Sequence, residues 1–207
     1  MKLTLDGQAI DVVEESDSSL SLVIERISHM LKERFRVVSE LEVDGVAVGD
    51  WSDPAFQAQT VGQTQEIRIR SEEPRKLAVK VLYEIATYMP KIQDALIKTS
   101  EKIQSRKEEE GMRLLEQVTS TWAELLHGLQ SAILVTGIDL QAIQVKEKTF
   151  LDINNEIHQF LEEISRFVQD QQYLELSDIL EYELAPRLPE LEEGIYQIIK
   201  SVEQAIH

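Results

Sequence analysis

The sequence predicts an α+β protein, with a small N-terminal sheet domain over residues 1–72 and an antiparallel up-down four-helix bundle over residues 73–207. Two observations lead to this prediction. Up to residue 70, short segments alternate apolar and polar residues, which is typical of strands with one buried face. After Pro74, apolar residues recur every three or four positions over long stretches, which is typical of amphipathic helices that bury one face.

The first predicted element is a β-hairpin over residues 1–14. Leu3 and Leu5 alternate with polar neighbours, and the dipeptide Asp6-Gly7 favours the tight turn of a two-residue hairpin. Residues 9–13 are expected to form the return strand.

An amphipathic helix is predicted next. The cluster Ser16-Asp17-Ser18-Ser19 offers side-chain oxygens that cap the first backbone N–H groups of a helix. The helix is expected to reach about Arg34, because its apolar residues keep helical spacing: Leu20, Val23, Ile24, Ile27, Met30 and Leu31.

Three further strands complete the predicted sheet. The first carries its apolar residues on one side: Phe35, Val37, Leu41 and Val43. Asp44-Gly45 then turns the chain into a short strand over residues 46–48. The last strand, residues 65–70, directs Ile67 and Ile69 inward and the intervening arginines outward.

The order of hairpin, helix, strand, short strand and strand resembles the β-grasp, or ubiquitin-like, fold. More narrowly, residues 41–51 (LEVDGVAVGDW) and Val61-Gly62 before EIRIR are similar to the small sulfur-carrier proteins of thiamin biosynthesis. Those carriers and ubiquitin act through a free C-terminal Gly-Gly whose carboxylate is adenylated. Here the last strand leads into Ser71-Glu72-Glu73-Pro74 and the chain continues. The resemblance therefore implies the fold and not the carrier function.

Two long helices are predicted after this domain. Pro74 suits the first turn of a helix, and Glu72 and Glu73 are favourable beside its positive end. Pro90 removes one hydrogen bond inside this helix and is expected to bend it. The predicted apolar face consists of Leu77, Val81, Ile85, Tyr88, Met89, Ile92, Ala95, Leu96 and Ile103.

The second helix is expected to follow a reversal near residues 105–107. Glu108-Glu109-Glu110 fits the positive start of a helix, and Gly137 is typical of a C-terminal cap. The stripe between them has bundle spacing: Met112, Leu115, Val118, Trp122, Leu125, Leu129 and Ala132.

The third helix is clear from about Thr149, and residues 138–148 are either a loop or, as Leu140 and Ile143 favour, part of that helix. Its apolar residues are Phe150, Ile153, Ile157, Phe160, Leu161, Ile164, Phe167 and Val168. After a reversal at 170–172, the fourth element meets two prolines. Its apolar residues are Leu176, Ile179, Leu180, Leu184, Leu188, Leu191, Ile195, Ile198, Val202 and Ile206.

Net charge excludes some classes of partner. The chain has 21 basic and 38 acidic residues, so its formal charge of −17 repels nucleic acid and anionic membranes. Residues 150–207 alone carry 3 basic and 13 acidic residues. These acidic helix faces are either ordinary solvated surfaces or a docking surface for a basic partner. No apolar run approaches the roughly 18 residues of a membrane span, so no membrane association is expected.

The sequence indicates no enzyme, metal or cofactor. There is no cysteine, no Gly-x-Ser-x-Gly turn and no clustered glycine loop for phosphate. Glu124 and His127 form one Glu-x-x-His pair, but a di-metal bundle requires two such pairs. His158 follows Asn155 rather than a glutamate, so half of that ligand set is missing.

The most unusual stretch is SDILEYELAPRLPEL, residues 177–191. Proline is strongly unfavourable inside a helix, so Pro186 and Pro189 are expected to end, kink or restart it. One interpretation is a local bend with Arg187 paired to neighbouring carboxylates. The alternative is a partner-binding patch of Tyr182, Glu183, Pro186 and Arg187, with Tyr83, Tyr88 and Trp122 lining a groove beside it, although aromatic residues at helical spacing are more often core.

In length, acidity and helix pattern, residues 74–207 resemble small four-helix secretion chaperones, especially the flagellin export chaperone. This resemblance implies a protein that holds an aggregation-prone amphipathic segment of another protein in a groove. The leading hypothesis is therefore a non-enzymatic, cytoplasmic adaptor or chaperone that binds a basic or amphipathic protein segment. Self-association through helix faces is also plausible. The alternatives are a self-associating structural or regulatory scaffold and, more remotely, a metal-dependent enzyme in the bundle.

Overall fold

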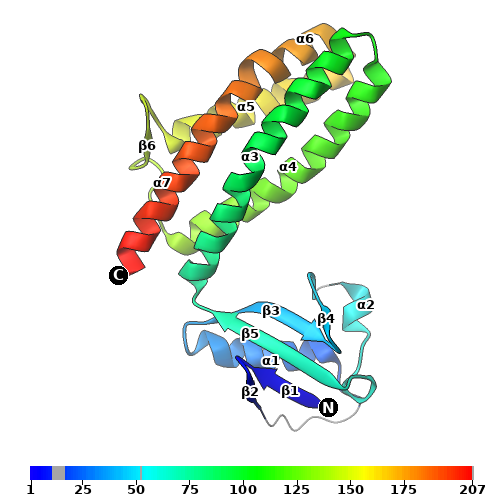
Figure 1. Ribbon diagram of the computed structural model, residues 1–207, viewed down its shortest axis with the longest axis vertical. Helices are drawn as coiled ribbons and strands as arrows, with labels where there is room; N and C mark the ends of the chain where they lie inside the picture. The colour runs from blue at the N-terminus through cyan, green and yellow to red at the C-terminus, as the bar shows by residue number, and fades with distance from the viewer. Residues whose placement is uncertain (11–16, 52, 207) are drawn as a thin grey trace. The chain divides into compact units, whose positions relative to one another are not determined.

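The computed structural model describes residues 1–10, 17–51 and 53–206 (Figure 1). A five-stranded mixed sheet comes first and a mostly helical region follows, which confirms the predicted α+β class. The chain forms two compact units, Met1–Leu77 and Ala78–His207, called here the sheet unit and the helical unit. Residues 11–14 of the predicted hairpin and Ser16 of the predicted cap lie outside the described residues.

The sheet has the strand order β2-β1-β5-β3-β4. Its members are β1 (Lys2–Leu5), β2 (Gln8–Ala9), β3 (Val37–Val43), β4 (Val46–Ala47) and β5 (Glu66–Glu72). The middle strand β5 runs parallel to β1 and antiparallel to β3, while β2 and β4 are the antiparallel hairpin partners of β1 and β3. Both Asp-Gly turns have positive φ at each residue, as the predicted two-residue hairpins require.

Helix α1 (Leu20–Lys32) begins at Ser19, whose hydroxyl accepts a hydrogen bond from the Leu22 N–H. Two short helices, α2 (Pro54–Gln57) and η1 (Val61–Gln63), precede β5. The apolar side of α1 packs against the sheet to form a core. The buried residues of this core are Leu3, Leu20, Val23, Ile24, Ile27, Leu31, Val38, Leu41, Phe56, Val61, Ile67 and Ile69.

The predicted alternation along β3 is wrong at its start. Phe35 has a φ of 55° and its side chain is 84% exposed, so it precedes the strand instead of joining its buried face. The register with β5 shifts between Val38 and Glu40. This bulge lets Val38 and Leu41, three residues apart, both be buried, which strict alternation does not allow.

The Asp6 carboxylate links the first turn to the end of β5. It accepts hydrogen bonds from Ser71 N–H at 2.8 Å and Ser71 Oγ at 2.6 Å, and Arg36 Nη2 lies 3.8 Å away. Partial burial raises the pKa of Asp6, but the Ser71 hydrogen bonds and the Arg36 charge outweigh it, so that this pKa lies below its usual value.

Replacing Asp6 by Asn is therefore expected to destabilise the sheet unit at pH 7 by about 0.5–1 kcal/mol, a discounted figure because the carboxylate is partly exposed. Asn tolerates the positive φ of this turn, so the loss reports the charge. Because a lowered pKa gives its full stabilisation only above the unfolded value of about 3.9, the difference from wild type is expected to shrink below that pH and to vanish as pH falls through the lowered pKa of Asp6. Denaturant unfolding at pH 7 and pH 3 measures this. An equal loss at both pH values contradicts the electrostatic explanation.

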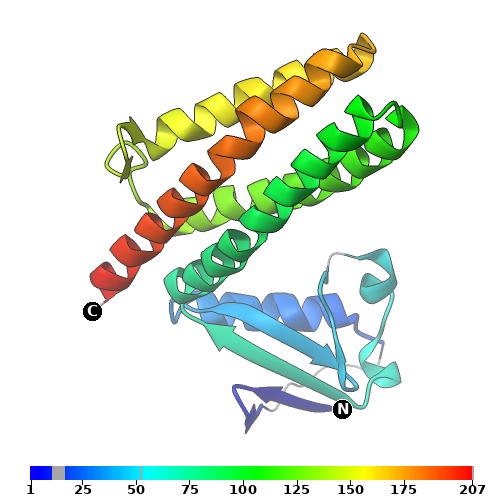
Figure 2. The same cartoon turned by 45° about the horizontal axis from the view of Figure 1, so that its top comes forward.

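The helical unit consists mainly of longer helices, and the first of them, α3, begins in the last residues of the sheet unit (Figures 1 and 2). In chain order the helical segments are α3 (Pro74–Gln104), α4 (Glu108–Thr136), α5 (Phe150–Gln169), α6 (Tyr173–Asp178), the π-helical η2 (Ile179–Leu184), the 3-10 turn η3 (Ala185–Arg187) and α7 (Leu188–Ile206). Pro90 lies inside α3, which continues through it. The predicted reversals contain residues with positive φ: Arg106, Gly137 and Gln171.

Residues 138–148 are not part of a helix, so the favoured prediction for them is wrong. They form a loop that carries two short antiparallel strands, β6 (Gln144–Val145) and β7 (Lys148–Thr149). Helix α5 starts sharply at Thr149 because Thr149 and Asp152 form a capping box. Lys146 adopts a positive φ of 55° in the turn between β6 and β7, which is incompatible with a helix.

The two prolines of the last segment are accommodated without a break. Ala185 N–H donates to the Leu180 carbonyl five residues back, and Leu188 N–H donates to the Ala185 carbonyl three residues back. Leucines occur every four residues, at positions 176, 180, 184 and 188. In a regular α-helix four residues rotate by about 400°, so each leucine would point about 40° away from the one before it. The wider π turn reduces that rotation, so all four leucines are buried.

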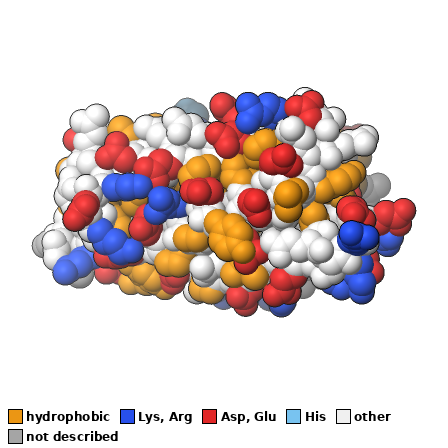
Figure 3. Space-filling view, turned by 90° about the horizontal axis from the view of Figure 1, so that it is seen from above, with side chains coloured by type: hydrophobic (Ala, Val, Ile, Leu, Met, Phe, Trp, Pro, Cys, Tyr) orange, Lys and Arg blue, Asp and Glu red, His pale blue; other side chains and the backbone are white. Residues whose placement is uncertain are grey.

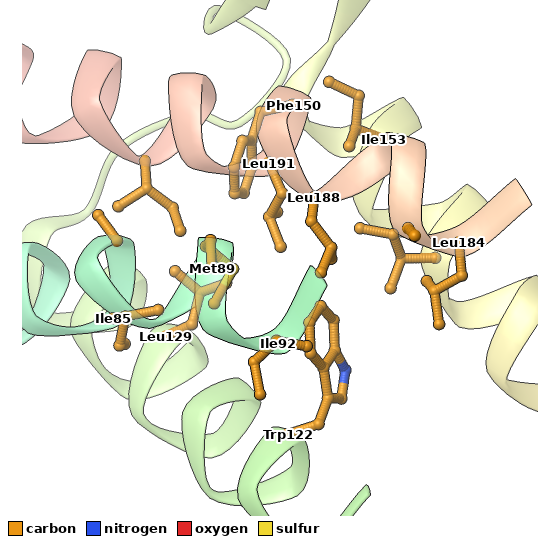
Figure 4. Packing of buried hydrophobic residues seen from close by; sticks show 14 of the residues in the cluster. Ile85, Met89, Ile92, Trp122, Leu129, Phe150, Ile153, Leu184, Leu188 and Leu191 are labelled. Atoms are coloured by element: carbon orange, nitrogen blue, oxygen red, sulfur yellow. The ribbon is translucent and has the colours of Figure 1, made fainter. Parts of the chain in front are cut away.

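One large apolar core fills the helical unit, and side chains from α3, α4, α5 and the last helical segment contribute to it (Figure 4). Along α3, the predicted residues Ile85 and Met89 are buried, whereas Tyr88 is 41% exposed. Ala78, Leu82 and Ala86 are buried in addition. The four-residue spacing of Ala78, Leu82 and Ala86 lies one position away from the predicted series Leu77, Val81, Ile85.

Candidate functional site

Trp122 belongs to the core and not to a recognition surface. Its side chain is 4% exposed and lines a cavity of about 10 Å³ with Ile85, Met89 and Leu191. Figure 4 shows the indole among buried aliphatic side chains. Its Nε1 atom has no hydrogen-bond partner among the residues that the structure describes. The prediction that Trp122 lines a partner groove is therefore wrong.

Tyr83 and Tyr88 lie on the exposed side of α3 in separate environments. The Tyr83 ring meets Tyr196 of α7 edge to face at 6.3 Å, and its hydroxyl donates to Glu203 Oε1 at 3.3 Å. Desolvation and then the Glu203 charge raise the pKa of Tyr83. Tyr88 instead lies under the Lys91 ammonium, 4.5 Å from the ring centroid.

Arg187 takes part in an ion-pair chain that joins three segments. Its Nε lies 3.2 Å from Glu156 Oε2 of α5, and its Nη1 donates to Glu190 Oε2 of α7 at 3.3 Å. Lys148 Nζ donates to Glu156 Oε1 at 2.5 Å. Lys146 Nζ donates to Glu190 Oε1 at 3.2 Å. The guanidinium is therefore occupied by structural partners, which agrees with the local-bend interpretation of Arg187.

Tyr182, Glu183 and Pro186 are exposed on or just after the π-helical segment. A hydrogen bond to Glu181 raises the pKa of Tyr182. Glu181 in turn accepts hydrogen bonds from Ser100 Oγ at 2.8 Å and Gln104 Nε2 at 3.0 Å of α3. The seven predicted partner-binding residues thus do not form one patch, because Trp122 is buried, Arg187 is paired and the tyrosines lie in different surroundings.

A groove between α4 and α5 is the best candidate site, and the sequence reasoning missed it. Its volume is about 390 Å³. The lining residues of this α4–α5 groove are Met112, Leu115, Glu116, Thr119, Leu161, Ile164, Ser165, Val168 and Gln169. The two helices run in opposite directions, so the start of α4 faces the end of α5 (Figures 1 and 2).

Sequence pattern explains why the groove stays open. Leu115 and Ile164 are buried at its floor, whereas Met112, Leu161 and Val168 are only partly buried. The short polar side chains of Thr119 and Ser165 leave the space between the two helices unfilled. A signal was present in the sequence: adjacent apolar pairs at 160–161 and 167–168 make the apolar face of α5 wider than one stripe requires.

Glutamate gives the groove its charge. Among the described residues that line it, Glu116 is the one charged side chain. On the face shown in Figure 3, apolar side chains are interspersed with acidic and basic ones. The groove is therefore mostly apolar, with the Glu116 carboxylate on its α4 wall.

The metal candidate residues Glu124 and His127 are both exposed on α4. Among the described residues no three His, Cys, Asp or Glu side chains are grouped so as to hold a metal ion. Within residues 1–10, 17–51 and 53–206, no helix combines the length and apolar character needed to cross a bilayer.

The fold and the site define an α+β protein whose helical unit carries an apolar groove. The chain belongs to the family described as "Domain of unknown function (DUF8042)", which matches residues 80–194, more than half of the chain and all of the groove. No curated protein and no solved structure matches the chain.

Proposed function

We propose that this protein is a non-enzymatic adaptor or chaperone that holds an amphipathic segment of another protein in the α4–α5 groove. The observation that carries this proposal is the groove itself, which leaves Met112, Leu161 and Val168 partly uncovered between two long helices. Apolar grooves between helices commonly bind amphipathic helices, because docking removes the apolar surfaces of both the groove and the helix from water.

The overall architecture supports the same proposal. The order and length of the helical segments support an antiparallel four-helix bundle of the secretion-chaperone type, with α6, η2, η3 and α7 as its fourth member. The order of hairpin, α1, β3, β4 and β5 in the sheet unit supports a β-grasp fold, which would be a second docking surface. Both assignments are proposals drawn from the order and length of the elements.

Filling the groove tests the proposal. Ser165 is exposed, so Ser165→Trp is expected to block the groove without removing a core contact, and to reduce partner capture at least tenfold. The matched control is Ser131→Trp, also at an exposed serine, about 18 Å further along α4 than Thr119. Affinity capture from the native host, quantified by mass spectrometry, compares both variants with wild type.

The expected result is one stoichiometric protein that wild type and Ser131→Trp capture and Ser165→Trp loses. Equal capture by both variants means that the groove is not the binding site. If only the bait is recovered and its mass in solution rises with concentration, the protein is a self-associating scaffold instead.

A further inference from the structure

Two glutamates, Glu116 and Glu162, lie at or beside the lining of the α4–α5 groove. Glu116 lines the α4 wall, and Glu162 lies on α5 three residues before Ser165, so that the two share a helix side. Neither carboxylate forms an ion pair or side-chain hydrogen bond with any residue that the structure describes. Both side chains are exposed; Glu116 lines the groove, and Glu162 directly follows the lining residue Leu161.

The nearest basic residues along the two helices already have partners. Arg113 of α4 pairs with Glu109, with 3.7 Å between Nη2 and Oε2. The Arg166 guanidinium of α5 lies 5.2 Å from the ring centroid of Phe167. Arg113 lies three residues before Glu116, and Arg166 lies four residues after Glu162. Among the described residues neither guanidinium forms an ion pair with these glutamates, so both carboxylates remain available to a partner.

Groove length limits the occupant to a short helical contact. Its lining residues extend from Met112 to Thr119 on α4 and from Leu161 to Gln169 on α5. At 1.5 Å per residue this is about 10–12 Å, or two helical turns. Two turns accommodate apolar anchors at positions i, i+3 or i+4, and i+7 of a docked helix.

We infer that the occupant is a basic amphipathic helix. Its apolar anchors lie against Leu115, Leu161 and Ile164, and its flanking Lys or Arg residues pair with Glu116 and Glu162. Complementary charge selects this partner over an acidic or neutral helix with the same apolar stripe. The net charge of −17 disfavours a second copy of this chain in the groove. This inference rests on the proposed function and assigns the two glutamates as the residues that determine specificity.

Three fluorescent peptides of about 14 residues, or four helical turns, provide the test. They share one leucine stripe and differ only in the flanking residues, which are Lys, Gln or Glu. Fluorescence anisotropy measures their binding to the full-length protein. The variants are Glu116→Gln/Glu162→Gln and the charge-matched control Glu192→Gln/Glu193→Gln on α7, a pair outside the groove.

Wild type is expected to bind the Lys peptide most tightly and the Glu peptide least. Glu116→Gln/Glu162→Gln is expected to weaken the Lys peptide about tenfold, the effect of two partly exposed ion pairs, and to leave the Gln peptide within about twofold. Glu192→Gln/Glu193→Gln is expected to change neither.

Each other outcome has a definite meaning. If the control pair weakens the Lys peptide as much as the groove pair, the preference is general attraction to an acidic protein and the inference is wrong. If Lys and Gln peptides bind equally and Ser165→Trp abolishes both, the groove function stands without charge selection. If Ser165→Trp changes no peptide, the inference and the groove function both fail.

Discussion

Replacing Trp122 by Ala is expected to lower the free energy of unfolding of the helical unit by about 3–5 kcal/mol, the largest single effect among these predictions. Trp122 is 4% exposed, and its ring fills the space between α3, α4 and the last helical segment (Figure 4). Truncation removes this apolar area from the core and leaves a cavity beside Ile85 and Met89. Denaturant unfolding followed by far-ultraviolet circular dichroism measures the loss.

Two comparisons make this result specific. Trp51 in the sheet unit is 40% exposed, so Trp51→Ala is expected to change the stability of the helical unit by less than about 0.5 kcal/mol. Trp122→Phe is expected to be milder than Trp122→Ala, because it keeps most of the apolar volume and removes a buried N–H without a described hydrogen-bond partner. A loss below about 1 kcal/mol for Trp122→Ala would contradict the core position of this residue.

Gly194 of α7 is the second position where a small change is expected to have a large effect. A Cβ added there would overlap Cδ2 of the fully buried Phe150 and lie 2.9 Å from its Cε2 and 3.1 Å from Val145 Cγ2. Gly194→Ala is therefore expected to destabilise the helical unit by about 1–3 kcal/mol, since the aromatic ring must move within a close-packed core. Thermal unfolding with a helix-sensitive signal measures the change.

Gly128 of α4 is the matched control, because an added Cβ there meets Ile85 Cδ1 at an ordinary 3.5 Å. Alanine is favoured over glycine in a helix interior by about 1 kcal/mol, so Gly128→Ala is expected to stabilise the protein. The two substitutions then have opposite signs although the chemical change is the same. Stabilisation by both would mean that the close contact between α7 and Phe150 is absent.

The comparison with the predicted site shows where sequence reasoning stops. Trp122 and Arg187 were each weighed as a structural residue and as part of a partner-binding patch, and the structure agrees with the structural alternative: Trp122 is core and Arg187 is paired with Glu156 and Glu190. Glu156 lies 31 positions before Arg187, and no periodicity predicts such a partner. The α4–α5 groove escaped notice for the same reason, since its two walls come from segments that are far apart in the sequence.

Local interactions fixed most of what the sequence alone determined. The two Asp-Gly turns, the Ser19 cap, the start of α4 at Glu108 and its end at Gly137 all follow from backbone conformations and hydrogen bonds within a few residues. The amphipathic periods of α4 and α5 predicted their buried residues for the same reason, because one face of each must leave water.

Tertiary structure alone decided the bulge in β3, the hairpin at residues 144–149, the π turn before Pro186 and the groove. Each of these depends on how side chains from distant segments share one volume at close-packed density, where a shift of one residue changes what is buried. Sequence periodicity states which face of a helix is apolar. Only packing against the other helices decides how much of that face remains uncovered, and so where a partner can bind.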